Sequence, residues 1–109
     1  MGVIGASVFQ VFCTVESEQR ARDLAGAVVD DRLAACVQIV GPIQSTYRWG
    51  EAVESSVEWP LLMKTTEERM RALQDRLVSV HPYEIPEVVA VRIEAGFPRY
   101  LDWIASSTS

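Results

Sequence analysis

The order in which two kinds of hydrophobic pattern follow each other constrains the fold of this chain more than any other feature. Apolar side chains alternate over residues 7–15 and 57–65, and residues 35–49 and 88–93 are rich in β-branched or aromatic types, which predicts four strands. Residues 17–33 and 67–80 repeat their apolar side chains at helical spacing, so Val80 in the second helix should face inward. Cys36, which begins the second strand, is interpreted as core packing. A proline at position 98 opens a short final helix to about residue 105.

Polar residues and prolines mark the ends of the predicted helices. Ser17 and Thr66 stand where N-caps are expected, because a short hydroxyl side chain can accept from the first free backbone N–H groups. The pair His81-Pro82 ends the second helix, since the residue before a proline avoids helical angles. Residues 82–86 then form a stiff, extended link into the last strand.

Two prolines and a glycine turn shape the middle strands. Gly41-Pro42 interrupts residues 35–49 and predicts a bulge or a bend. The run Trp49-Gly50-Glu51 predicts a turn, so a hairpin should follow. Pro60 lies inside the next strand, where it removes a ladder donor, and it predicts a bulge or a locally unpaired position.

The resulting order, strand–helix–strand–strand–helix–strand, is that of an α+β ferredoxin-like βαββαβ sandwich. Right-handed crossovers place both main helices on one face of the antiparallel sheet and leave the other face bare. With 109 residues, the chain fits a single domain over residues 1–109, with an ordered core of about 7–105.

The bare face is too apolar for a solitary molecule. A solvated sheet face should be polar at every second position. We expect Phe12, Val40, Leu62 and Val88 to lie on sheet surface that the two helices cannot fully cover, and the chain also holds three tryptophans. An apolar patch of this kind indicates an interface, so the sequence predicts an oligomer, although its copy number does not follow from this argument.

Charge and composition exclude several classes of function. The net charge is −5 and no basic stripe is visible, so nucleic acid is not an expected partner. No run approaches the roughly 18 to 20 apolar residues of a membrane span. With no secretory signal and only two cysteines, we expect a cytoplasmic protein. Nucleophile, phosphate-loop and dinucleotide motifs are absent, so we expect no enzyme.

Three side chains are candidate metal ligands, and each has an ordinary structural alternative. Cys13 offers a soft thiolate for copper, or is a small buried apolar residue. His81, the single histidine, offers an imidazole, or simply favours the negative end of a helix dipole. Glu87 offers a carboxylate, or is a solvated loop acid. The spacing of a closed structural zinc site is absent, so a site here would be weak or open, gathered from distant segments and from more than one subunit.

Aromatic residues are the expected interface anchors, because aromatic and arginine side chains are enriched where proteins associate. Tyr47, Arg48 and Trp49 fit this role better than that of a binding box, and Tyr83 can place its hydroxyl in a cleft between subunits. Trp59 and Trp103 complete the predicted interface set.

Several blocks in the right order resemble the CutA family of divalent-cation tolerance proteins. The most specific is residues 81–87, HPYEIPE, and further matches are CTV with SE over residues 13–18, LAACVQIV over 33–40, STYRW over 45–49, KTT over 64–66 and YLDWI over 100–104. The resemblance implies a tight homotrimer of ferredoxin-like protomers with an architecture similar to PII signalling proteins. It also implies tolerance to divalent metals, copper above all, and matches Cys13 to the family cysteine proposed to bind copper.

Two other functions remain open at this point. A PII-like protein can sense a small molecule in the clefts between subunits, although a glycine-rich phosphate loop is missing here. A trimeric scaffold for partner proteins is the third possibility. No cofactor is expected to be obligatory, while copper or another divalent cation is the expected ligand.

Overall fold

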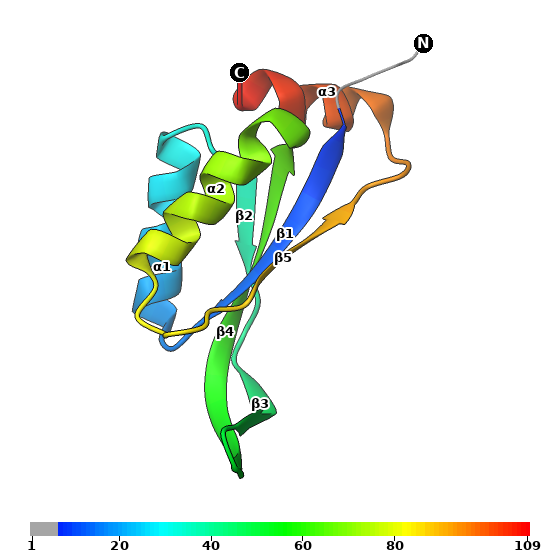
Figure 1. Cartoon of the computed structure of the whole chain (residues 1–109). Coiled ribbons are helices and arrows are strands. Elements are labelled where there is room, and N and C mark those ends of the chain that lie inside the picture. The colour runs from blue at the N-terminus through cyan, green and yellow to red at the C-terminus, as the bar shows by residue number, and fades with distance from the viewer. Residues whose placement is uncertain (1–6) are drawn as a thin grey trace.

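The computed structural model describes residues 7–109, which form one layer of sheet and three helices (Figure 1). The elements follow the predicted order, with one strand more than expected. They are β1 (Val8–Val15), α1 (Glu18–Asp30), β2 (Cys36–Ile39), β3 (Ile43–Trp49), β4 (Ala52–Thr66), α2 (Glu67–Val80), β5 (Val88–Arg92) and α3 (Pro98–Ser107).

The antiparallel sheet has the strand order β2-β4-β1-β5, and β3 pairs with the far half of β4. Helices α1 and α2 lie side by side on one face, while α3 crosses one end of the sheet (Figure 1). The main core lies between the two long helices and the sheet, and its fully buried members include Val11, Leu61, Met63, Leu73 and Leu77. This arrangement is the predicted ferredoxin-like sandwich with an additional C-terminal helix.

The interruption at Gly41-Pro42 is a bulge that divides the predicted strand 35–49 in two. Ile39 pairs with Leu61, whereas Ile43 pairs with Glu58, so three residues on one side face two on the other. The backbone N–H of Val40 donates to the Pro60 carbonyl (2.9 Å). In an antiparallel strand the nitrogen and the carbonyl of one residue point to the same side, so the nitrogen of Pro60 also faces the bulge. The donor that proline lacks is therefore missing where the ladder is already interrupted.

Helix α1 begins and ends at identifiable backbone features. Ser17 is its N-cap, and the Ser17 hydroxyl accepts from the backbone N–H of Arg20 (3.1 Å), as predicted. Beyond the C-terminus of the helix, Arg32 adopts a left-handed conformation (φ 60°), which is energetically unfavourable for a residue that carries a Cβ. Thr66 occupies the N-cap position of α2 without a side-chain capping bond, so only its position matches the prediction.

The sheet face opposite α1 and α2 is partly apolar and uncovered over much of its area. Val89 and Val91 on β5 are 52% and 56% exposed, and Val40 beside β2 is 39% exposed. Phe12 and Leu62 are only partly buried there. Val88 differs from the expectation, because it stands opposite Cys13 and packs against the main core beneath the helices.

The hairpin of β3 and β4 extends well beyond the helices (Figure 1). β4 begins at Ala52 and runs for 15 residues, five positions earlier than predicted from residue 57. Apolar side chains on this hairpin remain accessible: Val53 is 65% exposed and Val57 53%. They are accessible because no helix reaches this part of the sheet (Figure 1).

Two side chains expected inside lie nearer the surface. Val80, in the last turn of α2, is 42% exposed because the helix ends beyond the edge of the core. Cys36 is only partly buried, and its Sγ lies 3.5 Å from the Tyr100 hydroxyl. No helix formed by residues 7–109 combines the length and apolar character needed to cross a membrane.

Candidate functional site

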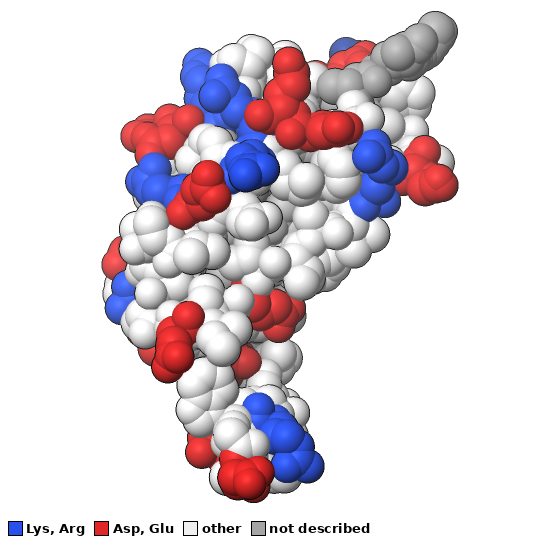
Figure 2. All heavy atoms as spheres, in the orientation of Figure 1, with Lys and Arg blue, Asp and Glu red and all other residues white. Residues whose placement is uncertain are grey.

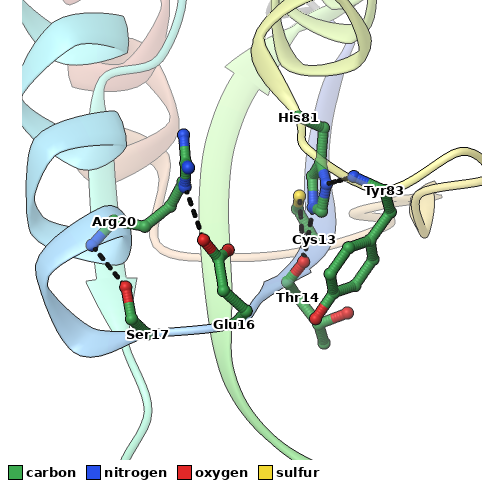
Figure 3. Close-up of polar contacts among 7 residues, drawn as sticks. All are labelled: Cys13, Thr14, Glu16, Ser17, Arg20, His81 and Tyr83. Atoms are coloured by element: carbon green, nitrogen blue, oxygen red, sulfur yellow. Dashed lines mark hydrogen bonds and ion pairs between the residues drawn. The ribbon is translucent and has the colours of Figure 1, made fainter.

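His81 joins the end of α2 to the end of β1 through both of its ring nitrogens (Figure 3). The backbone N–H of Tyr83 donates to Nδ1 (3.2 Å), so that nitrogen carries no proton. Nε2 then bears the proton and donates to the Thr14 carbonyl (2.7 Å). The Tyr83 ring packs against the imidazole at a centroid distance of 4.5 Å. His81 therefore fixes the start of the 82–87 link against β1.

Cys13 lies beside this histidine on the last part of β1 (Figure 3). Its side chain is fully buried, and its thiol makes only a long contact to the Thr14 carbonyl (3.9 Å). Burial first, and then the negative charges of Glu87 and Glu58, raise the pKa of the thiol to about 12. The group is consequently a neutral thiol at physiological pH, whereas a metal ligand must be a thiolate.

Glu87 precedes the first residue of β5, and Val88 pairs directly with Cys13 across the ladder. The acid is exposed but near enough for its charge to act on Cys13. The structure thus brings the three predicted ligands into one region. Over residues 7–109, however, no three His, Cys, Asp or Glu side chains are arranged to hold a metal ion together. The ligand set stays a prediction.

A groove of about 810 Å³ opens between the β3–β4 hairpin and the 82–87 link, and of the three predicted ligands only Glu87 lines it. Cys13 belongs to the core beneath the helices, on the other face of the sheet. The groove lies on the sheet face opposite α1 and α2, because Trp59 and Leu61 of β4 pack in the core beneath the helices and the alternating residue Glu58 points the other way. Its lining includes four carboxylates and a single cationic side chain: Glu54, Glu58, Glu84, Glu87 and Arg48. The groove therefore has a negative potential that favours cations.

Glu58 is the most buried acid of this groove, with only 7% of its surface exposed. The phenol of Tyr83 lies beside it. Burial first, and then the adjacent Glu58 carboxylate, raise the pKa of the Tyr83 hydroxyl above its usual range. Sequence patterns did not single out Glu58, Glu54 or Glu84, because each acid resembles an ordinary surface residue until the hairpin and the link lie together.

The predicted interface residues are placed in three regions. Tyr47, Arg48 and Trp49 lie on the projecting hairpin, where Trp49 is 45% exposed. Trp59 packs partly against the main core, so part of its surface is already used within the protomer. Trp103 on α3 is 43% exposed and stacks on Tyr100 (centroids 5.6 Å apart). Their role in assembly stays a prediction.

The charged side chains on the face shown in Figure 2 are of both signs and interspersed. They are densest towards the upper end of the view and occur again at the hairpin tip, with a few acidic side chains on the largely uncharged surface between (Figure 2). No continuous basic patch appears on that face. That nucleic acid is not a partner stays a prediction.

Comparison with known proteins identifies the family. The family model described as CutA1 divalent ion tolerance protein matches residues 9–107. The chain is 48% identical over 99 residues to the divalent-cation tolerance protein CutA of Thermus thermophilus, covering 90% of this chain and 95% of that protein. It is 40% identical over 107 residues to Protein CutA of Mus musculus, covering 98% of this chain but 60% of the mouse protein.

Solved structures agree with the sequence comparison. The crystal structure of CutA1 from Oryza sativa superposes with a TM-score of 0.93 at 36% identity, over 96% of each chain. The Thermus thermophilus structure superposes with a TM-score of 0.90 at 44% identity, over 94% of this chain and 99% of that one. The chain therefore belongs to the CutA1 divalent ion tolerance protein family.

Proposed function

We propose that this protein is a cytoplasmic homotrimer that binds copper or other divalent cations weakly, without catalysis, and so contributes to metal tolerance. The acidic groove, which Glu87 lines, carries the proposal. Four carboxylates line this groove against one arginine, and a low-dielectric wall concentrates the field of such a cluster on an approaching cation. Family membership supports the same role.

The uncovered sheet face supports assembly. Val89 and Val91 leave about half of their surface accessible, and further apolar side chains on the hairpin do the same. Burying a valine completely contributes about 1.5–3 kcal/mol, so covering the remaining half of each contributes about 1 kcal/mol. Repeated over several side chains and three protomers, this gain offsets the loss of translational freedom on association.

The contacts of the predicted ligands account for weak binding. Coordination by His81 breaks one of its two hydrogen bonds, to Thr14 or to Tyr83. Coordination by Cys13 releases a proton from a thiol whose pKa lies near 12. Each cost lowers the apparent affinity, so metal binding is expected to strengthen as pH rises. Donors from a second protomer complete the coordination in this proposal.

Calorimetric titration of the assembled protein with Cu²⁺, and with Zn²⁺ as a second metal, tests the proposal. The variants Cys13→Ala, His81→Ala and Glu87→Gln are expected to bind at least tenfold more weakly. Cys36→Ala, the other free cysteine, serves as the matched control and is expected to bind like the parent. Equal affinity in all four variants would show that the ligand assignment is wrong.

Sensing of a small molecule is the second candidate, and the groove favours it. A volume of about 810 Å³ lies within the range of small-molecule sites. Its acidic lining disfavours anions such as nucleotides, which require the opposite charge. A thermal-shift screen of nucleotides, other anions and organic cations separates this candidate from metal binding. Stabilisation by metal alone would remove the candidate.

A further inference from the structure

Lys64, the single lysine of the chain, lies on the partly apolar sheet face that the helices leave uncovered. Met63, its neighbour along β4, belongs to the core beneath the helices, so the Lys64 side chain points to the opposite face. In the ladder Lys64 stands between Cys36 of β2 and Gln10 of β1, in the middle of the sheet. A cation is therefore placed within the surface that the proposed assembly covers.

The ammonium group of Lys64 is only partly satisfied within one protomer. Its Nζ donates to Oε1 of Gln38 (3.0 Å), a neighbour on the same face. An ammonium group has three donors, so this bond leaves others to be satisfied. Over residues 7–109 no ion pair joins Lys64 to an acid, and residues 1–6 contain neither Asp nor Glu. The remaining donors need acceptors from solvent or from another copy.

Covering this face with a second copy removes the solvent from Lys64. A donor on a charged group that loses water without gaining an acceptor is strongly unfavourable, whereas Val89 and Val91 on the same face can pack in many registers. Copies can therefore meet stably only where the second copy places an acceptor against the ammonium group. A single buried polar side chain fixes register and copy number in coiled coils for the same reason.

We propose that Lys64 fixes the register in which copies of this chain assemble, by donating to the side-chain amide oxygen of Gln10 in a second copy. Gln10 lies in the same row of the same face, and a closed ring of copies brings such rows together around its axis. This inference rests on the homotrimer proposed above and adds the polar contact that selects one arrangement. It involves neither the metal ligands nor the groove beside the hairpin.

Reductive methylation of the full-length, assembled protein, read by mass spectrometry of its peptides, tests the contact. Lys64 carries the single side-chain amine of the chain, and the α-amino group serves as the internal reference. We expect Lys64, relative to that reference, to react about tenfold more slowly in the assembly than in the chain unfolded by guanidinium chloride. Equal relative rates in the two samples would overturn the proposal.

Variants test whether Lys64 selects the arrangement. Lys64→Met keeps the length of the side chain and removes its donors, so we expect several sedimenting species in place of one. Gln10→Leu removes the acceptor and should have the same effect. Arg71→Met makes a similar change on the exposed side of α2 and should sediment like the parent. Circular dichroism checks that each variant is folded.

Sedimentation separates failure of this inference from failure of the assembly. A parent that sediments as a solitary protomer would overturn both the homotrimer and the contact. A parent that assembles while Lys64→Met and Gln10→Leu each give one species of the same mass would overturn the contact alone. Loss of the single species in both variants, with Arg71→Met unchanged, would support the proposed role of Lys64.

Discussion

The buried thiol of Cys13 predicts a specific loss of stability in mild alkali. Its pKa is raised from 9.0 to about 12 by burial, Glu87 and Glu58. The unfolded chain loses this proton near pH 9, whereas the folded chain retains it up to about pH 12. Between these values the folded state binds more protons, so the free energy of unfolding falls as pH rises. The stabilisation is fully present below pH 9 and is lost towards pH 12.

From pH 8 to pH 10 this single thiol should lower the free energy of unfolding by about 1.4 kcal/mol per protomer. Urea unfolding followed by circular dichroism at pH 8, 9 and 10 measures the effect at one fixed protein concentration. Cys13→Ala should lower stability at pH 8 by leaving a small cavity, and should lose about 1.4 kcal/mol less than the parent on going to pH 10. Tyr83 and Tyr100 remain in both proteins, so the difference isolates the thiol.

Val11→Ala is the matched control, because Val11 lies on the same face of β1 and is 1% exposed but has no ionisable group. The free energy of unfolding of Val11→Ala should be lower than that of the parent by a similar amount at every pH. Parallel pH profiles for the parent and Cys13→Ala would refute the reasoning, since they would mean that Cys13 releases its proton at the same pH in the folded and unfolded states.

Two further substitutions probe the helix end and the uncovered face. Arg32→Gly should raise the free energy of unfolding by about 0.5–1 kcal/mol in urea titrations, because glycine adopts the left-handed conformation found there (φ 60°) without strain; a decrease would contradict this. Val89→Glu places a charge on the uncovered sheet face and should break the assembly in sedimentation velocity. Val78 on α2 is the control, because its side chain is 49% exposed against 52% for Val89, and Val78→Glu should leave the assembly intact. Equal sedimentation of the two would show that this face is not the interface.

Local rules were sufficient for the order of elements and for several boundaries. Ser17 caps α1, and the Gly41-Pro42 pair forms a bulge, because both effects depend on neighbours in the chain. The early start of β4 at Ala52 was missed because the exposed hairpin lacks a buried face, so its apolar alternation is weak. Val80 was misplaced because periodicity does not reveal where the sheet beneath a helix ends.

The candidate site was less predictable because its contacts are long-range. Cys13 and His81 were found by residue type, yet the bond from His81 to the Thr14 carbonyl spans 67 positions of sequence. Glu58 gave no signal, since its burial arises only when the 82–87 link packs beside the hairpin. Chemistry-bearing types can be named from the sequence, but their burial and their neighbours come from the fold.

Sedimentation equilibrium of the unmodified protein at micromolar concentration tests the central claim most directly. A chain of 12.1 kDa that covers its apolar sheet face with two further copies should sediment as one species of about 36 kDa. A folded, homogeneous species near 12.1 kDa would contradict the account, because the face bearing Val89 and Val91 would then be stable in water on its own.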